Sequence, residues 1–143
     1  NVLDLYAVGE EVEKKEARTS SVPFIQWVGL QGPRGETVRI RAVVDDGAMC
    51  GAIDSGVFQG VSTRLSALEP SGRVLRMANG AKVASQGVWR GTVDVGGVKR
   101  KGLFEVFPSG GAWSMLFGKP LLEEFSMLHD YRTDELILKT SSG

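Results

Sequence analysis

One stretch of the chain, residues 38–48, constrains the fold more than any other. Apolar and charged side chains alternate from Val38 to Ala42, and two more valines follow before Asp45, Asp46 and Gly47. This period-two alternation is typical of a β-strand with one face in the core. A strand of this kind ending in Asp-x-Gly holds an acid in partly desolvated surroundings, and glycine permits the tight turn that aims it. The stretch indicates a carboxylate suited to acid–base chemistry, although Asp and Gly are also ordinary turn residues.

The length and the turn content indicate one main domain that is rich in β-structure. A chain of 143 residues with 19 glycines and many valines is typical of short strands joined by tight turns. We expect this domain to span residues 22–140. Residues 1–21 include a charged run that buries almost nothing, so they are interpreted as a linker or a loosely docked arm, and residues 141–143 as a tail.

The charge balance excludes several classes of partner. Seventeen basic residues match 17 acidic ones, which gives no net attraction toward nucleic acid or anionic lipid. No apolar run approaches the roughly 20 residues that span a bilayer, and no basic-then-apolar leader opens the chain. A single cysteine excludes an internal disulfide. We therefore expect no nucleic-acid partner, no membrane association, and a location in the cytoplasm.

Strand patterns and turn signals alternate along the rest of the chain. Asn79-Gly80 is the strongest two-residue hairpin signal, since both residues accept positive φ, and Gly96-Gly97 is a second turn of this kind. The Gly-Pro turn after residue 31 pairs the first strand with the one that precedes Asp45. We expect strands at residues 24–30, 38–44, 74–78, 81–83, 87–95, 98–106, 113–117 and 135–139.

Two short helices are expected between these strands. Val61, Leu65 and Leu68 recur at helical spacing, and a Pro-Ser-Gly run stops the pattern, so a helix is predicted over residues 61–68. A second helix is predicted over residues 119–125, where Pro120 suits a first helical turn because its missing N–H costs nothing there.

Several chemistries do not fit the sequence. One cysteine and one histidine are too few for a zinc cluster, and a calcium loop that began at Asp45 would lack its oxygen ligands. Cys50, with His129 and Asp130, supplies the ingredients of a thiol protease, but a cysteine in an apolar segment is more often a packing residue. We expect no metal and no cofactor. The Asp-Gly sites at Asp45 and Asp54 remain.

Ordered features along the chain resemble a known family. These are the apolar strand, residues 45–48, the hairpins at residues 77–80 and 96–97, and the apolar run with glycine at residues 115–122. In this order they resemble the retropepsin-like aspartic proteases of retroviral and retrotransposon polyproteins, most of all those of fungal retroelements. The resemblance covers about residues 22–139. It implies an all-β fold, a closed barrel of the acid protease type with one or two short helices, active as a two-fold homodimer.

The resemblance also assigns roles to residues. It implies that Asp45 is the catalytic aspartate and that Asp46, Gly47 and Ala48 complete the active-site turn. Asp54 is interpreted as a turn residue, because only Asp45 follows a long alternating strand. Further roles are implied for two groups: a flap at Ala78, Asn79, Gly80 and Ala81, and packing behind the site by Leu116, Phe117 and Gly118.

Asp46 departs from the family pattern, which has Thr or Ser at this position. The hydroxyl of that residue links the two active-site loops, and two ionised Asp46 side chains facing each other would repel. The resemblance then implies a site that is most active at acid pH. The alternative is a catalytically silent module that dimerises or binds peptides.

Aspartic proteolysis also predicts an assembly. It needs two carboxylates that share one proton, and the side chain of Asp46 points away from that of Asp45 along an extended backbone. A homodimer in which each subunit contributes Asp45 is the simplest solution. The expected substrate is an extended peptide or polyprotein, and the resemblance implies a location in the cytoplasm or within retroelement particles.

Overall fold

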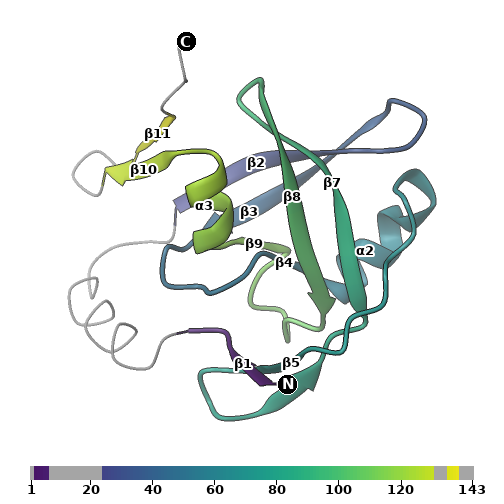
Figure 1. Cartoon of the computed structure of the whole chain (residues 1–143), viewed down its shortest axis with the longest axis vertical. Helices are drawn as coiled ribbons and strands as arrows, with labels where there is room; N and C mark the ends of the chain where they lie inside the picture. Colours follow the sequence, from purple (N-terminus) through teal and green to yellow (C-terminus); the bar gives the residue numbers. More distant parts are fainter. Residues whose placement is uncertain (1, 7–23, 131–134, 139–143) are drawn as a thin grey trace.

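The computed structural model describes residues 2–6, 24–130 and 135–138, and within them β-structure dominates (Figure 1). The strands are β1 (Val2–Asp4), β2 (Phe24–Gln31), β3 (Thr37–Val44), β4 (Ala52–Asp54), β5 (Val74–Arg76), β6 (Lys82–Ala84), β7 (Gly87–Val95), β8 (Val98–Phe107), β9 (Met115–Phe117), β10 (Met127–Asp130) and β11 (Glu135–Leu138). The helices in these ranges are α2 (Ser55–Val61), the short 3-10 helix η1 (Ser62–Arg64) and α3 (Lys119–Glu124). Among the described residues, no helix is long and apolar enough to span a membrane.

Six strands form a closed barrel, in the order β2-β3-β9-β4-β8-β7. Pairing of Leu30 with Val93 joins β2 to β7 and completes the ring. Along β3 the buried side chains alternate with exposed ones, as the sequence predicts. Inside the barrel, Trp89 and Phe104 are fully buried with ring centroids 6.2 Å apart. The prediction of an all-β closed barrel with one or two short helices is confirmed.

The position of β9 brings the ends of two strands together at one edge of the barrel. It lies between β3 and β4, parallel to the first and antiparallel to the second. Val44 at the end of β3 is opposite Phe117 at the end of β9. Since parallel strands end at the same edge of a sheet, the residues that follow them, Asp45 and Gly118, are brought together.

A second, smaller sheet packs against this edge. It has the order β1-β5-β6, with β1 parallel to β5, and Figure 1 shows it at the lower end of the view. The segment from β5 to β6 is the hairpin predicted around Asn79-Gly80. An apolar cluster joins this sheet to the barrel, and its buried members are Leu5, Ala48, Cys50, Ala52, Leu75, Phe107 and Leu116. Residues 2–6 thus belong to the folded body, while residues 7–23 lie outside the described ranges.

The C-terminal part confirms the second predicted helix and the closing strand. α3 has Pro120 in its first turn and buries Leu121 and Leu122 against the core. β11 pairs with β10 in an antiparallel hairpin. Residues 131–134 and 139–143 lie outside the described ranges.

The helix predicted over residues 61–68 is wrong. The helix α2 ends at Val61, and η1 continues only to Arg64. The helix starts earlier because the carboxylate of Asp54 accepts the N–H of Val57 at 3.2 Å and caps its first turn. Leu65 is nonetheless buried. The spacing of the apolar residues therefore reflects packing against the core rather than a helical backbone. Asp54, interpreted from the sequence as a turn residue, is instead the last residue of β4 and the N-cap of α2.

Candidate active site

The backbone of the Asp45 turn is fixed by hydrogen bonds on both sides. The N–H of Asp45 donates to the carbonyl of Phe117 at 3.1 Å, which ties the turn to β9. The carbonyl of Asp45 accepts the N–H of Ala48 at 3.2 Å. Its carboxylate oxygen Oδ1 accepts the N–H of Gly47 at 2.8 Å. A half-buried carboxylate is therefore held in a defined orientation at the end of a buried strand.

Gly118 packs directly behind this turn. A Cβ atom at position 118 would contact the carbonyl of Cys50 and would lie 2.9 Å from the carbonyl oxygen of Ala48. The next residue, Lys119, donates its N–H to that same Ala48 oxygen at 2.8 Å. Only glycine leaves room for this approach, so the sequence at 118 is fixed by the turn that it supports.

Leu116, Phe117 and Gly118, to which the resemblance assigned a packing role, lie next to the Asp45 turn. Leu116 and Phe117 are each 1% exposed. They pair with Val43 and Val44, the last two residues of β3. The structure therefore brings the predicted turn, residues 45–48, together with the predicted packing group, residues 116–118.

The predicted flap residues form the exposed tip of the β5–β6 hairpin. The N–H of Gly80 donates to the carbonyl of Met77 at 2.9 Å, and the N–H of Ala81 donates to Oδ1 of Asn79 at 2.9 Å. The loop is longer than the two-residue turn that the sequence suggested, and of its two central residues only Gly80 has positive φ. The base of the hairpin packs next to the Asp45 turn, since Leu75 lies in one apolar cluster with Ala48.

One feature of this region was missed from the sequence. The N–H of Met49 donates to the carbonyl of Leu5 at 2.7 Å, and Tyr6 forms an antiparallel bridge with Ala48. The N–H of Leu5 donates to the carbonyl of Arg76 on β5 at 3.0 Å. Residues 2–6 thus run between the Asp45 turn and the β5–β6 hairpin. The alternating apolar residues Leu3 and Leu5 were the available signal, but the charged run after them suggested a loose arm.

Asp46 and Asp54 have different surroundings. Asp46 is half-buried in the same turn as Asp45. Asp54 lies outside the turn, where its Oδ1 accepts the N–H of Ser109 at 2.8 Å. Burial raises the pKa of Asp54, but hydrogen bonds from Ser109, Val57 and Gly56 outweigh burial and hold that pKa below its ordinary value. Asp54 is therefore engaged as a helix cap.

Cys50 is unsuited to nucleophilic chemistry. Burial, reinforced by the nearby charge of Glu105 and partly offset by Arg73, raises the pKa of its thiol to about 12. The thiolate is the nucleophilic form, so almost none is present near neutral pH. Among the described residues no group of three or more His, Cys, Asp and Glu side chains is placed to hold a metal ion.

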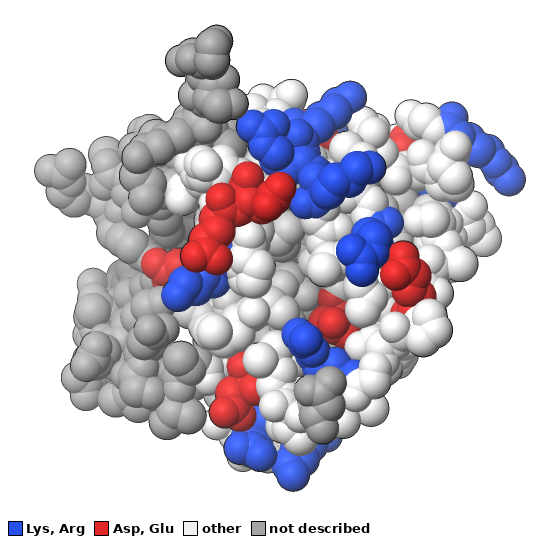
Figure 2. All heavy atoms as spheres, viewed as in Figure 1, with Lys and Arg blue, Asp and Glu red and all other residues white. Residues whose placement is uncertain are grey.

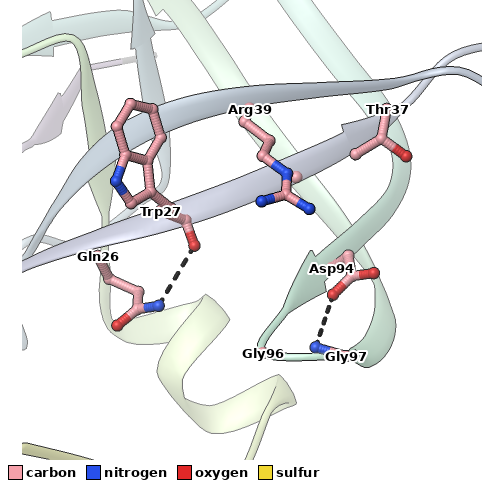
Figure 3. A pocket seen from close by; sticks show the side chains of 8 residues that line it. Gln26, Trp27, Thr37, Arg39, Asp94, Gly96 and Gly97 are labelled. Atoms are coloured by element: carbon pink, nitrogen blue, oxygen red, sulfur yellow. Dashed lines mark hydrogen bonds between the residues drawn. The ribbon is translucent and has the colours of Figure 1, made fainter.

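A separate hollow of about 440 Å³ lies on the outside of the barrel (Figure 3). It is formed by β2, β3 and the β7–β8 turn, with Trp27, Arg39 and Asp94 among its lining residues. Asp94 accepts the N–H of Gly97 at 2.9 Å and so caps that turn. None of residues 45–48 is among the residues that line this hollow.

Acidic and basic side chains are mixed over the face seen in Figure 2, with basic side chains at both its upper and its lower edge. Two exposed ion pairs in the described part of the chain join opposite charges at 3.4 Å: Arg76 with Asp4, and Arg90 with Glu69. Pairs this exposed contribute little to stability.

Comparison with known proteins defines the fold. No family model matches the sequence. Among solved structures, the chain is similar to the retroviral protease-like domain of Ddi1 from Leishmania major, with a TM-score of 0.61 and 16% identity, over 82% of this chain and 88% of that one. A protein of unknown function from Legionella pneumophila matches with a TM-score of 0.45 and 12% identity, over 73% of this chain and 87% of that one. The first likeness shows that the chain has a retropepsin-like fold.

Proposed function

We propose that the chain is an aspartic endopeptidase with Asp45 as its catalytic residue. The observation that carries this proposal is the fixed Asp45 turn, in which the N–H of Gly47 binds the carboxylate and Gly118 supports the backbone from behind. The retropepsin-like fold supports the proposal, because the Asp45 turn follows β3 at the point where that strand pairs with β9.

The chemistry requires a partner for Asp45. Two carboxylates about 3 Å apart share one proton; the ionised one removes a proton from water, and the protonated one donates a hydrogen bond to the substrate carbonyl. Within the chain, Asp54 is engaged as a helix cap. We therefore assign the second carboxylate to Asp45 of a second copy, related to the first by a two-fold axis.

The proposed substrate is an extended peptide segment of a polyprotein, most simply that of a retroelement. It would bind between the active-site turn and the β5–β6 hairpin by strand-like hydrogen bonds. Ala78 to Ala81 would close over it as the flap. This activity would take place in the cytoplasm or within retroelement particles.

The primary test is a peptide-cleavage assay on the purified chain and on its Asp45→Asn variant. The variant keeps the size of the side chain and the acceptor for the Gly47 N–H, but it cannot ionise. We expect cleavage to be abolished while the circular dichroism spectrum is unchanged. Asp54→Asn is the matched control and should retain cleavage. Activity that survives in Asp45→Asn would remove Asp45 from the mechanism.

A second candidate function is a catalytically silent module that dimerises or binds peptides. Asp46 favours it, because a carboxylate stands where the family pattern has a hydroxyl. A mixed peptide library assayed from about pH 4 to pH 7, with and without a statine-type inhibitor, separates the two functions. Inhibitor-sensitive cleavage supports the endopeptidase. Peptide binding without cleavage at any of these pH values supports the silent module.

A further inference from the structure

Residues 2–6 lie between the Asp45 turn and the β5–β6 hairpin, where the proposed peptide substrate would bind. Leu5 uses both of its backbone polar groups: its carbonyl accepts the N–H of Met49 at 2.7 Å, and its N–H donates to the carbonyl of Arg76 at 3.0 Å. The first partner follows the Asp45 turn, and the second belongs to the β5 arm of the hairpin. An extended peptide held through its main chain by two neighbouring segments is the general mode of strand addition.

The direction in which residues 2–6 run past the Asp45 turn is also defined. Tyr6 bridges Ala48 in antiparallel fashion, so the chain advances toward Asp45 as it passes from Leu5 to Tyr6. On the other side β1 runs parallel to β5, with Val2 opposite Val74.

The side chains of residues 3–5 alternate between an apolar cluster and solvent. Leu5 is only 1% exposed, and it packs with Ala48, Cys50, Leu75 and Leu116. Leu3 is partly buried in the same cluster. Asp4, between them, points outward and pairs with Arg76 at 3.4 Å. Leu5 is thus the apolar anchor, and Asp4 supplies a charge that complements the hairpin.

The pairing of β1 with β5 is short enough that a competing peptide can displace β1. Among the described residues, β1 has three residues and pairs with one strand, β5, which also has three residues. Val2 at its start is 45% exposed. Short edge strands with few buried side chains open at much lower free energy than the core of a domain.

We propose that residues 2–6 occupy the substrate groove as an intramolecular competitor and that they define the substrate class. This inference rests on the proposed function. The preferred substrates are extended peptides with a leucine-sized aliphatic side chain at the position of Leu5 and an acidic side chain directly before it. A segment tethered to the same chain has a high effective concentration, so it raises the apparent KM for peptides added in solution.

The test compares the unsubstituted chain with two variants that each lose one leucine side chain. Leu5→Ala removes the anchor, and Leu103→Ala is the matched control because Leu103 is 45% exposed on β8. We expect Leu5→Ala to lower KM by about tenfold, since losing most of a buried leucine shifts the occupied groove toward the open one by that order. The kcat should not change, because saturating substrate displaces the segment in either chain. Leu103→Ala should change neither constant.

A binding measurement provides a readout that does not require catalysis. A fluorescein-labelled peptide with the sequence Val-Leu-Asp-Leu-Tyr is titrated with each chain and followed by fluorescence polarisation. It should bind Leu5→Ala about tenfold more tightly than it binds the unsubstituted chain. If Leu5→Ala does not fold, Asp4→Lys replaces it, because the side chain of Asp4 is 44% exposed. Tighter peptide binding by about twofold, lost at high salt, is then expected.

The outcomes separate this inference from the proposed function. Cleavage with an unchanged or higher KM in Leu5→Ala, together with equal peptide binding by both chains, would overturn the inference and leave the endopeptidase intact. Tighter binding by Leu5→Ala with no cleavage by any chain would support the groove and overturn the proposed activity. Equal binding by folded Asp4→Lys and unsubstituted chains would also count against the inference.

Discussion

At the scale of single residues, the site is determined by contacts to the backbone. The Asp45 carboxylate accepts the N–H of Gly47, and the absence of a side chain at Gly118 lets β9 approach the carbonyls of Ala48 and Cys50. An oriented acid at the end of a buried strand needs both features. The orientation of Asp45 therefore depends on a residue 73 positions further along the chain, at the start of α3.

The first prediction concerns Gly118→Ala. The added methyl group would meet backbone carbonyls that cannot rotate away, so we expect a loss of about 1–3 kcal/mol in the free energy of unfolding. Urea denaturation measures it. Gly72→Ala is the matched control, because a Cβ there has no neighbour within 4 Å. A Gly118→Ala chain as stable as the control would contradict the packing described for the turn.

The second prediction concerns how the contribution of Asp54 to the free energy of unfolding depends on pH. Its pKa is lowered in the folded chain, so its ionised form stabilises the fold at pH values above the ordinary aspartate pKa of about 4. This stabilisation disappears as pH falls through the lowered pKa. We expect Asp54→Asn to lose about 1 kcal/mol in the free energy of unfolding at pH 7, and the gap should narrow below about pH 4. A gap that is constant between pH 7 and pH 3 would show that the charge has no part in it.

At the scale of elements, sequence patterns predicted structure where local and tertiary forces agree. The alternation along β3, the Gly96-Gly97 turn and the Pro120 helix all appear as expected. Both glycines of that turn have positive φ, at 58° and 88°. These features are encoded by residues that are adjacent in sequence, so they can be recognised without the rest of the fold.

The sequence-based predictions failed where a contact between residues far apart in the chain decided the structure. The helix α2 begins at Ser55 because Asp54 caps it, and the same carboxylate is held by Ser109 from a loop 55 residues away. The segment at residues 2–6 has an alternating pattern too short to identify a strand. Its position depends on Arg76 and Met49, which no local pattern connects to Leu5.

At the scale of the whole molecule, the small sheet packs against one edge of the barrel, and the two form the walls on either side of residues 2–6. The barrel supplies the Asp45 turn, the small sheet supplies the hairpin, and one apolar cluster joins them. The resemblance in the sequence predicted the barrel, the turn and the hairpin, and the likeness to the Ddi1 domain supports that fold. It did not predict that the chain's own residues would lie between the two walls.

The central claim is that two copies of Asp45 act together, and a subunit-mixing experiment tests it most directly. A fixed amount of the unsubstituted chain is refolded with increasing amounts of Asp45→Asn, and peptide cleavage is measured. Mixed dimers contain one ionisable Asp45, so we predict that activity falls toward zero as the variant is added in excess. Adding Asp54→Asn instead should not lower activity. Activity that stays constant as Asp45→Asn is added would show that each copy works alone, and it would contradict the account.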